Sequence, residues 1–453
     1  MQQNMSINRR QFLKKAAAVA AGVTFPYFVP SSVLGRAGGV AASNRITLGC
    51  IGTGNQGVKD MRGFLQNDDV KVVAVCDVNT ASYGYRSAKQ YLGREPGRKI
   101  VNDYYAAKTR SGRYKGCDAY NDFREVISRD DIDAVLIVTP DHWHAAMTIM
   151  AAKAGKDIYC EKPLSLTVAG GRAMVEAVKK YGVILQTGTH HRSTQQVRFA
   201  CELVRNGRIG RLKRIIVNLD RHPVRFPIES WQPMPVPDGF DYDMWLGPAP
   251  WAPYHKHRCL YTFRFGRDYS GGETTNTGAH CFDIAQWANG TDRTGPVEFE
   301  DLGSEFPPKD ALFNTVSKVH FRARYANGVE LLCTPNPRRE AARFEGTEGW
   351  IDAGWYECRP YPESLKDSII GPDEIHLYES NDHYRNFIDC VKTRREPVVP
   401  VEVGHRSATI CHLGNIAMLL KRKIRWDPDN ERCIDDEQVN RMLSKPMRCP
   451  WHL

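Results

Sequence analysis

Short apolar runs alternate with helical patterns through the first half of the chain. The runs at 46–51, 70–76, 134–138, 157–160 and 183–187 predict strands, and the segments 79–92, 121–128, 144–154 and 168–181 predict helices. Residues 134–138 (AVLIV) form a continuous apolar run, typical of a parallel strand buried on both faces. A basic insert at 93–116 interrupts the rhythm. The alternation predicts a doubly wound α/β domain.

The pattern changes after a predicted helix at 194–206. Longer strands are expected at 212–219, 297–302, 316–325 and 329–334, and helices at 277–289, 383–391 and 405–420. A segment rich in Pro, Trp and Tyr occupies 221–270. Strands without regular intervening helices predict an open, mostly antiparallel sheet. We therefore expect a first domain over 43–188 and a C-terminal α+β domain over 189–453, whose last helices can pack back on the first domain.

A glycine pattern follows the first predicted strand. Its residues are Gly52, Gly54, Asn55, Gln56 and Gly57, in a G-x-G-x-x-G spacing. Gly52 permits a tight turn, Gly54 leaves room for a pyrophosphate, and Gly57 lets the helix pack against the strand. The helix N-terminus then faces the phosphates. This pattern predicts a dinucleotide-binding Rossmann unit, and the alternative is an ordinary glycine-rich turn.

Asp77 lies at the end of the second predicted strand, 20 residues after Gly57. An acid at this position accepts hydrogen bonds from the adenosine ribose hydroxyls and repels a 2′-phosphate. Asp77 therefore favours NAD over NADP as the cofactor.

Lys162 follows the predicted strand at 157–160, within the sequence CEKP. Ligands of open α/β sheets bind at the carboxyl ends of the strands. A lysine beside a cationic nicotinamide ring has a lowered pKa, which suits a general base. A solvated lysine after a strand is the competing interpretation.

Four motifs occur in order: TPDHWH at 139–144, CEKP at 160–163, NTGAHCFD at 276–283 and VEVGHRS at 401–407. With the glycine pattern, they make the chain resemble the Gfo/Idh/MocA oxidoreductases, the superfamily of glucose–fructose oxidoreductase and inositol dehydrogenase. The resemblance implies a Rossmann domain, NAD or NADP, and a sugar, cyclitol or related polyol substrate. It also implies that the C-terminal sheet forms a homo-oligomer, a dimer or tetramer.

The resemblance assigns roles to individual residues. Lys162 matches the lysine that touches the nicotinamide ribose and the substrate hydroxyl, and His280 matches a catalytic acid/base. The residues expected beside the cofactor are Thr139, Pro140, His144 and Glu161. The family often has aspartate where this chain has Asn276, and asparagine orients a hydroxyl without taking its proton. With asparagine at position 276, the substrate proton would be removed by His280 or Lys162. The alternative is that the protein has lost rapid turnover.

His190, His191 and Arg192 follow the last predicted parallel strand, and we expect them to contact substrate hydroxyls. Adjacent histidines point in different directions and no third ligand follows at a telling spacing, so the sequence predicts no metal site. Asp283 is counted among the candidate substrate-binding residues, where it either orients His280 or simply packs in its helix. Trp245 belongs to the aromatic segment at 221–270. Its flat ring is expected to bind a sugar, and the alternative is that the aromatic rings only pack this segment onto the sheet.

Residues 8–14 (NRRQFLK) form a twin-arginine pattern, followed by an alanine-rich stretch at 16–29. We expect 1–42 to be a signal that engages the twin-arginine export machinery, placing the protein in the periplasm or, if the signal is retained, tethered to the membrane. Residues 1–42 hold five Lys and Arg and no acids, so the net charge of +10 falls to +5 without them, which gives no argument for nucleic-acid binding.

No CxxC pair occurs among the 13 cysteines, and only a late pair among Cys358, Cys433 and Cys449 is open to a disulfide.

Together these features predict an exported NAD-dependent oxidoreductase. It would pass a hydride from a secondary hydroxyl of a sugar or glycoside to a tightly held cofactor and leave a keto-sugar. One alternative is an NAD-dependent glycoside hydrolase that oxidises its substrate transiently, and another is a non-catalytic sugar- or cofactor-binding protein.

Overall fold

The computed structural model describes residues 40–219, 231–336, 342–354 and 357–453. The predicted export signal lies almost wholly outside the described residues. Residues 46–453 form one compact unit, which contains both predicted domains. No helix in the described ranges has the length and apolar character needed to cross a membrane.

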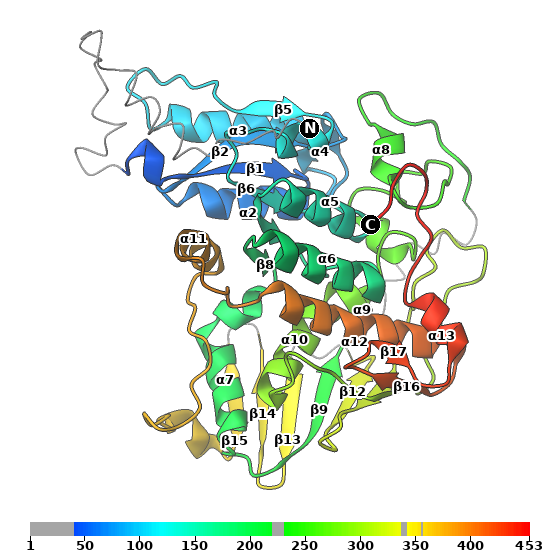
Figure 1. Ribbon diagram of the computed structural model, residues 1–453. Coiled ribbons are helices and arrows are strands. Elements are labelled where there is room, and N and C mark those ends of the chain that lie inside the picture. The colour runs from blue at the N-terminus through cyan, green and yellow to red at the C-terminus, as the bar shows by residue number, and fades with distance from the viewer. Residues whose placement is uncertain (1–39, 220–230, 337–341, 355–356) are drawn as a thin grey trace, which may run out of the picture. The chain divides into compact units, whose positions relative to one another are not determined.

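The first sheet is entirely parallel and has six strands in the order β5-β2-β1-β6-β7-β8 (Figure 1). Its strands are β1 (Ile46–Ile51), β2 (Val70–Cys76), β5 (Asp118–Tyr120), β6 (Ala134–Ile137), β7 (Asp157–Cys160) and β8 (Leu185–Thr187). Its helices are α2 (Asn55–Leu65), α3 (Arg94–Ala106), α4 (Phe123–Ile127), α5 (Asp141–Lys153) and α6 (Val168–Tyr181). One apolar core lies under α4, α5 and α6, and another under α2 and α3. Helices on both faces confirm the doubly wound prediction.

The segment between β2 and β5 differs from the prediction. The expected helix at 79–92 is wrong, because that stretch holds the two short strands β3 (Ser82–Tyr83) and β4 (Tyr91–Leu92). Gly84 and Gly93 have φ angles of 103° and 134°, which helices do not allow. The helix α3 instead begins after Gly93, inside the basic insert.

The second sheet has nine strands in the order β15-β14-β13-β9-β12-β11-β10-β16-β17. They are β9 (Leu212–Asn218), β10 (Glu298–Asp301), β11 (Phe321–Arg324), β12 (Glu330–Thr334), β13 (Ala342–Gly346), β14 (Trp350–Ala353), β15 (Cys358–Tyr361), β16 (Ile424–Asp427) and β17 (Arg432–Cys433). All neighbouring pairs are antiparallel except β9 with β12. The helices α7 (Gln195–Arg205), α10 (Gly278–Asn289) and α12 (Val401–Leu420) share its apolar core. This open, mostly antiparallel sheet confirms the predicted fold class.

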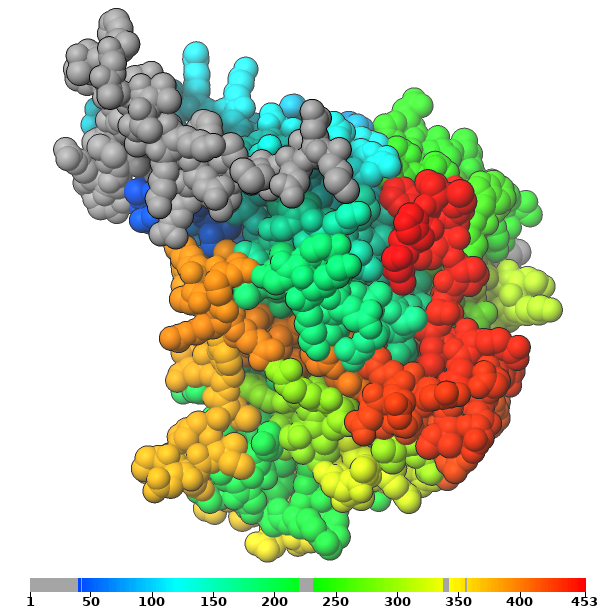
Figure 2. All heavy atoms as spheres, viewed as in Figure 1, coloured from blue at the N-terminus to red at the C-terminus, as the bar shows by residue number. Residues whose placement is uncertain are grey.

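Four further α-helices lie in the described residues. They are the short α8 (Tyr242–Leu246) and α9 (Glu273–Asn276), then α11 (His383–Thr393) and α13 (Glu437–Met442). Phe387 of α11 packs into the core under α2. Arg448, near the C-terminus, donates to the Gly247 carbonyl at 2.9 Å, and the last residues lie on the surface beside the α8 segment (Figure 2). All 13 cysteines are free thiols, so the late cysteines form no disulfide in this structure.

Candidate active site

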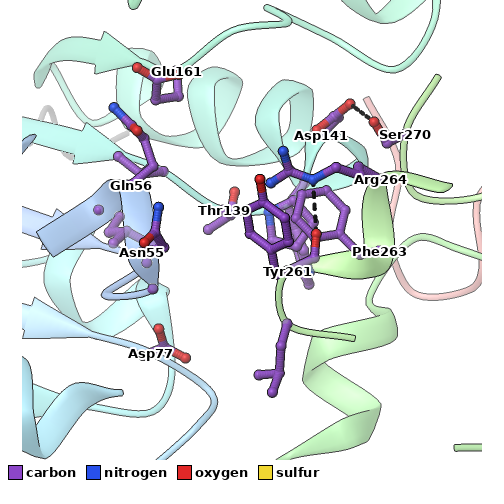
Figure 3. A pocket seen from close by; sticks show the side chains of 18 of the residues that line it. Asn55, Gln56, Asp77, Thr139, Asp141, Glu161, Tyr261, Phe263, Arg264 and Ser270 are labelled. Atoms are coloured by element: carbon purple, nitrogen blue, oxygen red, sulfur yellow. Dashed lines mark hydrogen bonds between the residues drawn. The ribbon is translucent and has the colours of Figure 1, made fainter. Parts of the chain in front are cut away.

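A cavity of about 520 Å³ opens at the carboxyl edge of the parallel sheet. One wall comes from the strand ends of the first domain, and the other comes from α9, α10 and the segment around 240–270 (Figure 3). The expected residues that line it are Gly52, Gly54, Asn55, Gln56, Gly57, Asp77, Thr139, Pro140, Glu161, Lys162, His190, Trp245, Asn276 and His280. Most of the residues selected from the sequence therefore face one space.

The turn after β1 requires glycine because a side chain at Gly52 or Gly57 would clash with the protein's own backbone. A Cβ on Gly57 would lie 1.9 Å from the Gly52 carbonyl oxygen, and one on Gly52 would lie 2.3 Å from the Val138 carbonyl oxygen. Gly54 is the N-cap of α2 and offers no side-chain cap. The first N–H groups of the helix therefore remain available to a phosphate.

Asp77 is held rigidly at the end of β2. Its Oδ2 accepts a hydrogen bond from the Thr53 amide at 2.8 Å, and its Oδ1 accepts one from the Asn79 amide at 2.9 Å. Burial raises the pKa of the Asp77 carboxyl, and these hydrogen bonds oppose that rise. A fixed carboxyl group at this position fits a ribose with free hydroxyls better than a phosphorylated ribose.

Lys162 and Asn276 meet across the two domains. Lys162 Nζ donates to the Asn276 backbone oxygen at 2.9 Å and to Asn276 Oδ1 at 3.2 Å. Burial lowers the pKa of Lys162, the Glu161 carboxylate partly offsets this, and the Arg264 cation lowers it further. The arrangement favours a lysine that can exist as a neutral amine and accept a proton.

Arg264 is a site residue that the sequence analysis missed. Its Nη1 donates to Asn276 Oδ1 at 2.9 Å, and its guanidinium lies 3.9 Å from the centre of the Tyr261 ring. Asp141 was also missed, and it accepts a hydrogen bond from Ser270 at 2.5 Å within the cavity wall (Figure 3). Asp141 belongs to the TPDHWH motif and could have been found there, whereas nothing in the sequence distinguishes Arg264.

His280 lies on α10 with its ring stacked on His191, at a centroid distance of 4.9 Å and an interplanar angle of 14°. Burial lowers the pKa of His280 well below its usual value, and the Lys162 cation adds to this. At neutral pH the imidazole is therefore uncharged. It is suited to hydrogen bonding with a substrate oxygen and is a weak proton acceptor.

Three expected contact residues lie outside the cavity wall. Arg192 donates to Asp283 Oδ2 at 2.8 Å and to Asp292 at 2.7 Å, and Ser407 donates to Asp283 Oδ1 at 3.0 Å. This structure does not support the substrate contacts predicted for Arg192 and Asp283, because each side chain is buried and neutralised by the other. His191 does not line the cavity, because its ring is stacked on the ring of His280, which does.

His144 also supports the site from behind. Its two ring nitrogens lie 2.9 Å from the carbonyl oxygens of Thr139 and Pro163. His144 was expected to contact the cofactor directly. In this structure both of its ring nitrogens bind carbonyl oxygens of the protein, so it positions the loops at Thr139 and Pro163 instead. Trp245 does line the cavity, with its ring stacked against Tyr242 at 5.9 Å.

Comparisons with known proteins agree with this geometry. Residues 46–189 match the family model described as an oxidoreductase family NAD-binding Rossmann fold, and residues 201–453 match its C-terminal alpha/beta domain. The chain is 31% identical to a myo-inositol 2-dehydrogenase of Thermotoga maritima over 40% of this chain and 47% of that protein. It is 28% identical to a scyllo-inositol 2-dehydrogenase (NAD(+)) of Bacillus subtilis over 70% of this chain and 85% of that protein.

A third relative is an α-N-acetylgalactosaminidase of Shewanella oneidensis, 28% identical over 48% of this chain and 43% of that protein. Several of the curated relatives are thus matched over less than half of their length. Among solved structures, an aldose-aldose oxidoreductase from Caulobacter crescentus has a TM-score of 0.59 at 20% identity, covering 84% of this chain and 99% of that one. The two family models together cover most of residues 46–453, and the chain belongs to the Gfo/Idh/MocA oxidoreductase family, with an NAD-binding Rossmann domain.

Proposed function

We propose that this protein oxidises a secondary hydroxyl of a carbohydrate or glycoside with bound NAD, giving a keto-sugar. The observation that carries the proposal is the meeting of Lys162, Asn276 and His280 in the same cavity as the glycine turn. Relatives named as inositol dehydrogenases and a levoglucosan dehydrogenase support this substrate class.

The residues divide the chemistry between them. Lys162, as the neutral amine, accepts the hydroxyl proton while the C–H electron pair leaves as hydride. NAD, when bound, supplies the hydride acceptor at nicotinamide C4. His280 and Asn276 hold the substrate oxygen by hydrogen bonds, and the carbon is left as a ketone. We assign the proton-accepting role to Lys162 rather than to His280, because burial lowers the pKa of His280 well below its usual value.

The lining of the cavity suits a sugar. Trp245 and Tyr261 contribute aromatic rings to it, and Asp141 and Arg264 contribute polar groups. Apolar faces with a few converging polar groups are typical of small-molecule sites. This composition supports a polyol rather than a wholly apolar substrate.

Lys162→Met tests the assignment. We expect it to abolish reduction of bound NAD by sugars while dinucleotide affinity stays within about threefold, since the glycine turn and Asp77 would still hold the pyrophosphate and the adenosine ribose. Lys309→Met, on the exposed surface, is the matched control and should behave as wild type. Full turnover by the Lys162 variant would contradict the proposal.

A glycoside hydrolase is the second candidate, favoured by the α-N-acetylgalactosaminidase relative. Transient oxidation would acidify the neighbouring C–H, the aglycone would leave by elimination, and water addition with return of the hydride would restore the sugar. The same side chains would serve both reactions. Release of free sugar from a glycoside without net NADH would identify this activity.

Export, cofactor recycling and assembly belong to the same proposal. The twin-arginine pattern at 8–14 supports export of the folded protein, and an exported enzyme would reoxidise its tightly held cofactor with a second sugar. We also propose a homo-oligomer through the nine-stranded sheet, as the family resemblance implies. Fractionation of cells and light scattering of the purified protein test these points.

A further inference from the structure

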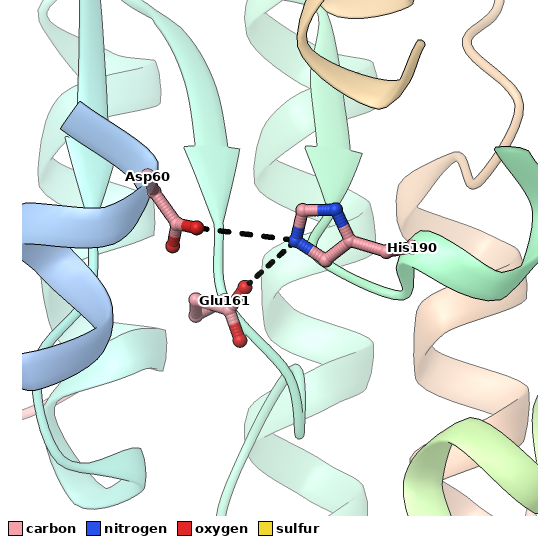
Figure 4. Close-up of side chains that lie close together, drawn as sticks. All are labelled: Asp60, Glu161 and His190. Carbon is pink, nitrogen blue, oxygen red and sulfur yellow. Dashed lines mark ion pairs between the residues drawn. The ribbon is translucent and has the colours of Figure 1, made fainter. Parts of the chain in front are cut away.

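Three side chains with metal-binding groups meet beside the cavity, and the proposed reaction does not use them as ligands. They are Asp60 of α2, Glu161 after β7 and His190, and their ligand atoms all lie within 4.8 Å of one another (Figure 4). His190 Nε2 is 3.6 Å from Glu161 Oε1 and 3.9 Å from Asp60 Oδ1. Donor atoms bound at about 2.1 Å to one ion are separated by up to about 4.2 Å, so these two spacings suit a shared ion.

Each of the two buried carboxyl groups keeps one oxygen atom without a hydrogen-bond partner in the part of the chain that the structure describes. Asp60 is 0% exposed and Glu161 is 4% exposed, and neither Asp60 Oδ2 nor Glu161 Oε1 has a hydrogen-bond partner among the described residues. Ionising two neighbouring buried carboxyl groups has a large cost in free energy, because the two negative charges repel each other and lose their hydration. A cation between them offsets this cost.

The surrounding groups hold the three ligands in place. Gln56 and Tyr384 both donate to Asp60 Oδ1, at 2.8 and 2.9 Å, which leaves Oδ2 available. Such outer hydrogen bonds orient ligating groups at metal sites. Tyr159 Oη lies 3.1 Å from His190 Nε2, so an ion must displace this hydrogen bond.

We propose that Asp60, Glu161 and His190 bind one divalent cation at the edge of the cavity. Carboxylate oxygens with one imidazole nitrogen favour Mn²⁺, Fe²⁺ or Zn²⁺ over Ca²⁺. Glu161 and His190 line the cavity, which gives an ion an entry path and open coordination positions. The ion neutralises the carboxylate pair and fixes Glu161 beside Lys162. No telling spacing in the sequence joins Asp60, Glu161 and His190, so the sequence analysis could not predict this cluster.

Mn²⁺ binding tests this site without measuring activity. The purified protein is stripped with chelator, exchanged into chelator-free buffer and titrated with MnCl₂, and free Mn²⁺ is followed by electron paramagnetic resonance. We expect one bound ion per chain, with spin-echo modulation from a nitrogen ligand. No bound ion at millimolar Mn²⁺, or a bound ion without a nitrogen ligand, overturns the proposal.

Variants then locate the ion. Asp60→Asn and His190→Gln should each weaken Mn²⁺ binding by about tenfold or more. Asp310→Asn and His452→Gln change the same residue types on the exposed surface and should leave it unchanged. Unchanged binding in both cluster variants would overturn the assignment. The nitrogen signal of the wild-type protein decides the matter if a variant does not fold.

Discussion

Arg264→Gln probes how the site makes Lys162 a base. The guanidinium and the Lys162 ammonium both donate to Asn276 Oδ1, at 2.9 and 3.2 Å. Glutamine keeps a hydrogen-bond donor near this oxygen and removes the charge. The variant therefore isolates the electrostatic effect of Arg264 on its neighbour.

The expected magnitude follows from the geometry. The two cations lie at most about 6 Å apart, and at an effective dielectric constant of about 20 their repulsion is roughly 3 kcal/mol. Arg264 is half-buried, so solvent screening reduces this to about 1.4 kcal/mol, or tenfold in an equilibrium constant. Removing the charge raises the pKa of Lys162, so less of the neutral amine is present at neutral pH.

The assay is the pH dependence of sugar oxidation under conditions where chemistry limits the rate. Activity requires neutral Lys162, so it rises with pH through the pKa of that lysine. In Arg264→Gln we expect the acidic limb to move to higher pH and kcat/KM at neutral pH to fall about tenfold. Arg264→Lys keeps the charge and should restore the limb towards its wild-type position. A limb that stays in place in Arg264→Gln, with only KM changed, would refute the reasoning.

Three further predictions follow from the same structure. Asn276→Asp places a carboxylate beside Lys162, so it should raise the lysine pKa and lower the rate at neutral pH; a rate gain in the same pH profile would contradict this account. Asp77→Asn should weaken NAD binding by about tenfold, as expected for a lost charged hydrogen bond. It should also reduce the ratio of the affinity for NAD to the affinity for NADP. Equal NAD affinities of the wild type and the variant in a fluorescence titration would count against the ribose contact. Arg192→Met leaves Asp283 as a buried unpaired charge and should destabilise the fold by about 3–5 kcal/mol; denaturant unfolding measures this, and Arg192→Met with Asp283→Asn should recover part of the loss.

The parallel sheet could be predicted because its signals are local. Residues 157–160 and 168–181 form a strand and a helix with the expected bounds, since an apolar run and a capped amphipathic segment each specify their own structure. In the second sheet, the sequence analysis missed the strands β13, β14, β15, β16 and β17. The sequence of β13 (ARFEG) has only two apolar positions, Ala342 and Phe344, and its strand is defined by pairing with β9.

The site shows the same division. The glycine turn and the carboxyl ends of the strands place Gly52, Asp77 and Lys162 by rules that act over short stretches of chain. Arg264 reaches Asn276 through the fold of a long aromatic segment, and no spacing reveals that contact. Arg192 and Asp283 have the polarity expected of substrate ligands, and only their approach to 2.8 Å shows that they satisfy each other.

The most direct test of the proposed function is to identify the cofactor and show that it cycles. The purified protein is denatured and any released dinucleotide is identified by mass spectrometry. The native protein is then mixed with sugars, cyclitols and glycosides while the near-ultraviolet absorbance of reduced nicotinamide is followed. The account predicts bound or readily bound NAD that a polyol reduces and a keto-sugar reoxidises. A protein that neither carries nor binds NAD, or whose bound NAD no substrate reduces, would contradict it.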